Sequence, residues 1–128
     1  MKLINTSLSN CSFEVSKLLW KKGCCCQDGL TGWSEDGKNC ISHHSSFYSS
    51  EKYPIDEITQ ALAIEWIRVN FKIWIRINSM DGKIWFFDIW DFRKDIEEQI
   101  IIDDENEFNS PKESTEHALL YALKNLIK

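Results

Sequence analysis

Residues 71–91 carry the pattern that most constrains the fold of this chain. Aliphatic or aromatic residues occupy every second position from 71 to 77, and a different set lies between them: Lys72, Trp74, Arg76 and Asn78. This period of two is typical of a β-strand with one buried face. Residues 83–91 are apolar on both faces, which indicates a central strand with helices against it. Asp81 and Gly82 tolerate positive φ, so we expect a turn at 79–82 between strands at about 71–78 and 83–91.

Three segments with helical spacing flank this hairpin. They lie at about 12–22, 54–70 and 111–127. Ser12 can cap the first helix and Gly23 can end it. Pro54 suits the first position of the second helix. Ser110 and Glu113 have the spacing of a capping box, which predicts the start of the third helix.

A connection rich in Cys, Gly and Ser spans residues 23–53. Its strand-like pieces are 24–26 and about 38–43, and the β-branched run at 100–102 favours a further strand. This order of elements lacks the alternating βαβ units of a parallel sheet. The length of 128 residues is typical of one domain. We therefore predict a single α+β domain over 1–128, in which three helices pack against a small antiparallel sheet.

The charge balance argues against a protein that mainly coats nucleic acid. Asp and Glu number 20 against 15 Lys and Arg, a net charge of −5, which repels phosphate chains. We find no apolar segment suited to a signal peptide or a membrane span. Five Cys, three of them adjacent, suit reduced thiols or a metal site better than a disulfide framework. We expect a cytoplasmic protein without a membrane partner.

A cluster of cysteine and histidine is the main candidate for metal binding. Zn²⁺ prefers thiolate and imidazole ligands, and Cys40 and His43 have the spacing of a ligand pair. With Cys24 and Cys26 they form the candidate ligand set. Cys24 and Cys26 point to one face only in an extended chain, so this half of the set fits less well. The alternative is a protein without a cofactor, in which these cysteines pack as small apolar residues.

The pattern favours neither thiol catalysis nor a hard metal ion. A thiol enzyme would pair Cys40 with His43, or a cysteine of 24–26 with His44, and nothing beside them indicates a residue that orients the base. Asp88, Asp91 and Asp95, or alternatively Asp103, Asp104 and Glu105, could hold Mg²⁺ or Ca²⁺, but a solvated acidic segment is far commoner. We therefore favour a protein without enzymatic activity and assign no catalytic residue.

The side chains between the buried positions of the first hairpin strand form the candidate binding site. Alternation directs Lys72, Trp74 and Arg76 to the face opposite the core. An aromatic side chain beside arginine is typical of protein contact sites. The same set resembles a stacking platform for single-stranded nucleic acid, and a helix of the same chain could also cover it. We weigh a contact with a partner or a second copy of the chain evenly against such internal cover.

Residues 12–22 and 53–128 resemble, in order, small phage and prophage proteins of Bacteroidetes. The best-matching parts are residues 62–68 (Leu-Ala-Ile-Glu-Trp-Ile-Arg) and 114–120 (Ser-Thr-Glu-His-Ala-Leu-Leu). An aromatic-rich strand follows the first helix in that family, and the triple Cys replaces it here. The resemblance implies a phage context and a shared fold, and it implies no catalytic residue. Residues 71–128 also resemble the antitoxin domain of HicB type.

These observations lead to an expected function. We expect a small phage or prophage accessory protein that binds a host or phage protein in the bacterial cytoplasm and that can form a homo-oligomer. The alternatives are a zinc-stabilised module, a protein that binds nucleic acid or nucleotides, and, as the least specific option, a HicB-like antitoxin.

Overall fold

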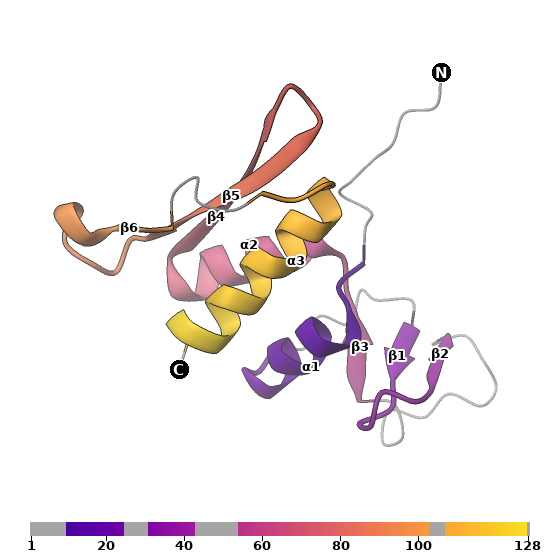
Figure 1. The fold of residues 1–128 in the computed structure, drawn as a ribbon. Helices are drawn as coiled ribbons and strands as arrows, with labels where there is room; N and C mark the ends of the chain where they lie inside the picture. The colour runs from indigo at the N-terminus through magenta and orange to yellow at the C-terminus, as the bar shows by residue number, and fades with distance from the viewer. Residues whose placement is uncertain (1–9, 25–30, 43–53, 103–106, 128) are drawn as a thin grey trace.

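The computed structural model describes residues 10–24, 31–42, 54–102 and 107–127 (Figure 1). The α-helices within these residues are α1 (Phe13–Lys21), α2 (Gln60–Phe71) and α3 (Pro111–Tyr121). The larger antiparallel sheet has the order β4-β5-β6, formed by Ile73–Met80, Ile84–Asp91 and Ile100–Ile102. The smaller one has the order β2-β1-β3, formed by Cys40–Ser42, Thr31–Trp33 and Ile55–Glu57. The α+β prediction is confirmed.

Helices α2 and α3 pack side by side on one face of the larger sheet, while α1 lies next to the smaller sheet (Figure 1). Ile73 and Ile75 of β4 and Phe87 and Ile89 of β5 project toward these helices and are buried. The remaining buried apolar residues of the same core come from the other elements: Cys11, Val15, Leu19, Cys24, Ile58, Ala63, Ile67, Ala118, Leu119, Ala122, Leu123 and Ile127. No helix among the described residues is long and apolar enough to cross a membrane.

The predicted hairpin is confirmed, with its strands at 73–80 and 84–91. The register runs from Ile73 opposite Asp91 to Met80 opposite Ile84. Asp81 and Gly82 have φ of 58° and 67°, as a tight turn between twisted strands requires. The first strand begins two residues later than expected because α2 extends through Phe71. The predicted third strand at 100–102 is β6, and β5 is central in this sheet.

The prediction that the second helix starts at Pro54 is wrong. Residues 55–57 form β3, which pairs with β1, and Ile55 lies opposite Trp33 with its side chain fully buried. Helix α2 begins at Gln60, after Thr59, whose hydroxyl accepts a hydrogen bond from the Leu62 N–H at 3.1 Å. Long-range strand pairing therefore overrides the local helix signals at 54–58.

The connection at 23–53 contributes the other two strands of the smaller sheet. The strand expected at about 38–43 is β2, whereas β1 was not predicted. Cys24 is not part of a strand, because its N–H closes the end of α1 on the carbonyl of Leu19; Cys25 and Cys26 lie outside the described residues. Phe13 of α1 packs on Trp33 of β1, with ring centroids 5.4 Å apart. This contact joins the smaller sheet to α1.

The first helix is confirmed to within one residue at each end. The Ser12 hydroxyl accepts a hydrogen bond from the Val15 N–H at 3.2 Å. Gly23, just past the helix, has a φ of 92°, which a residue with a side chain rarely adopts. Both end signals therefore act as the sequence predicts.

The third helix has the predicted cap. The Ser110 hydroxyl accepts a hydrogen bond from the Glu113 N–H at 3.1 Å. In the described chain the Glu113 carboxylate does not accept a hydrogen bond from the Ser110 N–H. Only one of the two hydrogen bonds of the capping box therefore forms. After α3 the chain continues as a π-helical stretch, Ala122–Leu126, so the helical region ends one residue before the predicted 127.

A carboxylate joins the N-terminal ends of α1 and α2 to α3. Glu116 accepts a hydrogen bond from the backbone N–H of Ser12 at 2.9 Å and another from the Gln60 side chain at 3.1 Å. The same Gln60 nitrogen donates to the carbonyl of Lys112 at 2.9 Å. We call this set the Glu116 junction. It places a negative charge at the positive end of the α1 dipole.

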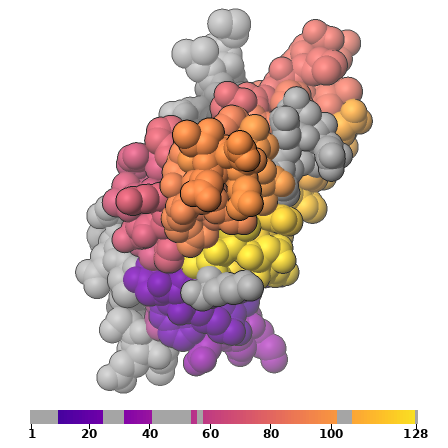
Figure 2. Space-filling view, turned by 90° about the vertical axis from the view of Figure 1, so that its left-hand side faces the viewer, coloured from indigo at the N-terminus to yellow at the C-terminus, as the bar shows by residue number. Residues whose placement is uncertain are grey.

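A second polar contact ties the end of β5 to the C-terminal helical stretch. The Arg93 guanidinium donates to both oxygens of Asp91, at 2.9 and 2.8 Å, and to the carbonyl of Leu126 at 3.1 Å. Figure 2 shows the segment after β5, in orange, at the surface beside the yellow C-terminal helix. The hydrogen bonds between Arg93 and Asp91 lower the pKa of Asp91 below its usual value and raise the pKa of Arg93.

Ser110→Ala should lower the free energy of unfolding by about 0.5–2 kcal/mol, because the Glu113 N–H loses its acceptor. Urea denaturation followed by circular dichroism measures this loss. Ser110→Asp, which keeps an acceptor at the cap, should remain close to the wild type. An unchanged midpoint and slope for Ser110→Ala would contradict the cap.

Asp91→Asn should flatten the fall in stability at acid pH. The pKa of Asp91 is lower in the folded than in the unfolded state, so its contribution is fully present above the unfolded value of about 3.9 and is lost as pH falls through the lowered folded value. We expect the free energy of unfolding of the variant to be lower at neutral pH and to decline less below about pH 4. Asp95→Asn, at an exposed carboxylate nearby, is the matched control. An acid decline as steep as that of the wild type would contradict this role.

Candidate functional site

The outer face of the β4-β5-β6 sheet, which points away from α2 and α3, carries two of the three predicted binding residues. Trp74 lies opposite Trp90 and Arg76 lies opposite Asp88, so each pair shares this face. Trp74 is 49% exposed. The predicted alternation is therefore confirmed, and it turns Trp74 and Arg76 away from the core.

Three aromatic side chains form a connected aromatic cluster on the outer face. The Phe92 ring meets Trp74 edge to face, with centroids 5.9 Å apart, and stacks on Trp90 at 6.2 Å. Phe92 is 42% exposed and Ile100 of β6, which lies opposite Trp90, is also exposed. The sequence analysis missed Phe92, although it continues the period of two from Trp90. Trp74, Trp90 and Phe92 are the members of the cluster.

A cation from α2 reaches over the edge of the aromatic cluster. The Arg68 guanidinium lies 5.3 Å from the centroid of the Trp74 ring, within the range of a cation–π interaction. Arg68 also forms an ion pair with Glu65 one turn earlier in the helix, and this bond lowers the pKa of Glu65. Glu65 therefore fixes the guanidinium beside Trp74. The sequence analysis did not single out Arg68, because its contact depends on how α2 packs against β4.

Lys72 has a different role from the one predicted. It lies between α2 and β4 in the left-handed conformation, with φ of 56°, and not within the strand. Its N–H donates to the carbonyl of Arg68, and its carbonyl accepts a hydrogen bond from the Phe92 N–H at 2.9 Å. The backbone of Lys72 therefore turns the helix into the strand and anchors Phe92. Its side chain is exposed.

Arg76 is held by a buried carboxylate. Its Nε donates to Asp88 Oδ2 at 2.9 Å and its Nη2 forms an ion pair with the same oxygen, while Asn78 donates to it at 3.1 Å. The Asp88 side chain is only 3% exposed, and its Oδ1 has no hydrogen-bond partner among the described residues. The Arg76 side chain is 65% exposed. Asp88 thus holds an exposed guanidinium in one orientation.

The acidic residues considered for Mg²⁺ or Ca²⁺ do not converge. Asp88 lies on the outer face with Arg76, whereas Asp91, three positions later, is directed to the opposite side and pairs with Arg93. Each of these carboxylates is paired with an arginine of its own chain. Asp88 and Asp91 therefore do not share a cation site, and Asp103, Asp104 and Glu105 lie outside the described residues.

The structure describes half of the predicted zinc ligands. Cys24 is buried at the end of α1, and Cys40 is exposed in β2. Cys26 and His43 lie outside the described residues. Across 10–24, 31–42, 54–102 and 107–127, no group of three or more Cys, His, Asp or Glu could hold a metal ion. The zinc site stays a prediction.

Comparisons with known proteins identify no relative: no family model matches the chain, and no curated protein and no solved structure is significantly similar to it. The resemblances to phage and prophage proteins and to HicB-type antitoxins therefore stay predictions.

Arg76→Ala should lower the free energy of unfolding by about 1–3 kcal/mol, because the buried Asp88 carboxylate loses its charged partner. Thermal and urea unfolding measure the loss. The control, Arg68→Ala, removes an arginine from an exposed ion pair and a cation–π contact, so it should cost less than about 1 kcal/mol. Equal, small losses for both variants would show that Asp88 does not need Arg76.

Proposed function

We propose that this protein functions by binding another protein through the outer face of its larger sheet. The observation that carries the proposal is the aromatic cluster, whose Trp74 and Phe92 are each nearly half exposed. In Figure 1 the helices α2 and α3 lie on the other side of this sheet. Two large rings that pack together at the surface favour a contact with a partner over the alternative, in which a helix of the same chain covers this face.

The composition of the outer face supports a protein partner. Tryptophan and arginine dominate binding energies at protein interfaces, where a central apolar group is surrounded by polar ones. Trp74 has Arg68 beside it, and Arg76 is the next residue on the same face of β4. Contacts with Phe92 and the pairing with Asp88 reduce the freedom of these side chains before binding. Less side-chain entropy is then lost when a partner docks.

The ion pairs of the face argue for a protein partner over nucleic acid. Arg68 pairs with Glu65, and Arg76 pairs with Asp88. A phosphate chain would have to compete with these carboxylates, and the chain as a whole has a net charge of −5. The arginines suit neutral acceptors, such as backbone carbonyls, at the rim of an apolar protein surface. The expected partner is therefore a protein with an exposed apolar patch; that it is a host or phage protein rests on the resemblance alone.

The double variant Trp74→Ala/Phe92→Ala should bind the partner with a Kd at least about tenfold higher, because it removes the centre of the contact. Wild-type protein, immobilised and exposed to nuclease-treated Bacteroidetes lysate, should retain a protein identifiable by mass spectrometry. Titration calorimetry with that purified protein then gives Kd for each variant.

The matched control is Val69→Ala/Ile96→Ala, which removes two exposed apolar side chains that lie outside the strands of the larger sheet. Binding by the control, loss of binding by the cluster variant and unchanged thermal unfolding of both would support the proposal. Equal binding by all three proteins would overturn it. The proposal would also be overturned if nuclease treatment abolished the retention of the partner. The same holds if sedimentation showed that the cluster variant loses only self-association.

A further inference from the structure

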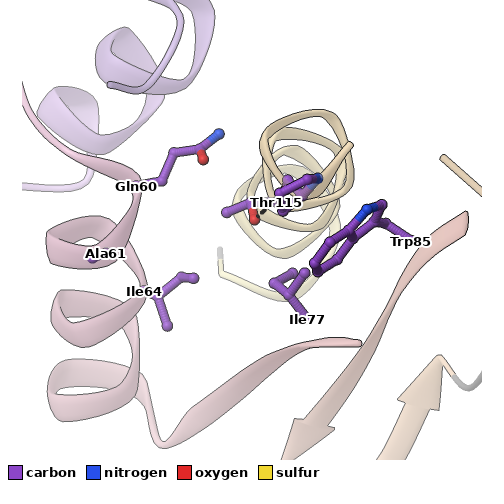
Figure 3. Close-up of a pocket in the computed structure, with 7 residues that line it drawn as sticks. Gln60, Ala61, Ile64, Ile77, Trp85 and Thr115 are labelled. Carbon is purple, nitrogen blue, oxygen red and sulfur yellow. Dashed lines mark hydrogen bonds between the residues drawn. The ribbon is translucent and has the colours of Figure 1, made fainter. Parts of the chain in front are cut away.

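A cavity of about 290 Å³ lies between α2, α3 and the β4–β5 hairpin, on the side of the sheet opposite the aromatic cluster (Figure 3). Ala61 and Ile64 line it from α2, Ile77 and Trp85 from the hairpin, and Thr115 from α3. Gln60, the first residue of α2, also lines it. The volume is close to the lower end of the range for small-molecule sites, about 300 Å³.

The Gln60 side chain provides an acceptor without a partner. Gln60 is 3% exposed, and its nitrogen donates to the Lys112 carbonyl and to the Glu116 carboxylate. Both partners can only accept, so the nitrogen must face them and the amide oxygen must face away. In Figure 3 this oxygen lies on the cavity side of the amide. It accepts no hydrogen bond in the described chain, so it is open to a donor that enters the cavity.

The other polar side chain from the helices also acts as an acceptor. The Thr115 hydroxyl donates its proton to the Pro111 carbonyl at 2.7 Å, so its oxygen can only accept from the cavity. None of the described residues that line the cavity is charged, and they are apolar apart from Gln60, Thr115 and the Trp85 indole N–H. A charged ligand would lose its hydration without gaining a counter-charge. The lining therefore favours a neutral ligand that donates a hydrogen bond.

We propose that this cavity binds a small neutral molecule of one or two fused rings that donates an N–H or O–H to the Gln60 amide oxygen. Ile64 and Ile77 enclose the rings, and the Trp85 indole forms a flat wall beside them. The proposal does not depend on the aromatic cluster, since Trp85 and Ile77 face the helices, whereas Trp74 and Trp90 face away from them.

Indole and benzothiophene test the proposal, because the two molecules have nearly the same shape and only indole donates a hydrogen bond. Each is titrated into ¹⁵N-labelled protein, and the signals of the Gln60 side-chain amide and the Trp85 indole N–H are followed by NMR. Indole should shift both signals in a saturable way and bind about three- to tenfold more tightly than benzothiophene. Changing the ligand is preferable to changing Gln60, whose nitrogen also holds α3.

Ala61→Leu should reduce the affinity for indole by at least about fivefold, because the larger side chain narrows the cavity from an exposed position on α2. Val69→Leu, a comparable apolar change on the same helix outside the cavity, should bind indole like the wild type. Equal affinity for the two ligands, or shifts that do not saturate at millimolar indole, would overturn the proposal. So would an unchanged affinity in a folded Ala61→Leu protein.

Discussion

The strict alternation of β4 is the constraint on which the rest of the structure depends. Ile73 and Ile75 are buried against α2 and α3, so Trp74 and Arg76 must occupy the other face of the same strand. A shift of one residue would exchange the two sets, exposing isoleucine and burying a guanidinium away from Asp88. The packing of the helices therefore fixes the outer face, although no helix contributes to its centre. The same alternation gives the hairpin two unlike surfaces, each with its own proposed ligand.

The parts of the fold that could be predicted are those determined by nearby residues. The hairpin, its turn and the Ser12 and Ser110 caps depend on short spacings that the sequence displays directly. The smaller sheet depends on pairs distant in sequence, such as Thr31 opposite Glu57. Strands of three residues carry little pattern of their own, so Pro54 and the apolar residues after it were interpreted as a helix.

The candidate site could also be predicted only where it depends on nearby residues. Trp74 and Arg76 follow from alternation, but the ion pair of Arg76 with Asp88 requires the register of the hairpin, which a shift in the turn would change. Arg68 reaches the outer face only because of how α2 is packed. Lys72 was placed in the strand because a period of two does not show where a helix ends. The Gln60 acceptor depends on contacts with α3, more than 50 positions away.

The Glu116 junction has a consequence for the order in which the chain can fold during synthesis. Ser12 and Glu116 are 104 positions apart, so α1 leaves the ribosome long before its carboxylate partner exists. A helix of nine residues is marginal in water on its own. Contacts with the smaller sheet, such as that of Phe13 with Trp33, can form earlier, but the hydrogen bond from Ser12 to Glu116 must wait for α3. Completion of the shared core is tied to α3, and a chain stalled before Glu116 would leave Val15 and Leu19 of α1 without their partners from α3, open to chaperones and proteases.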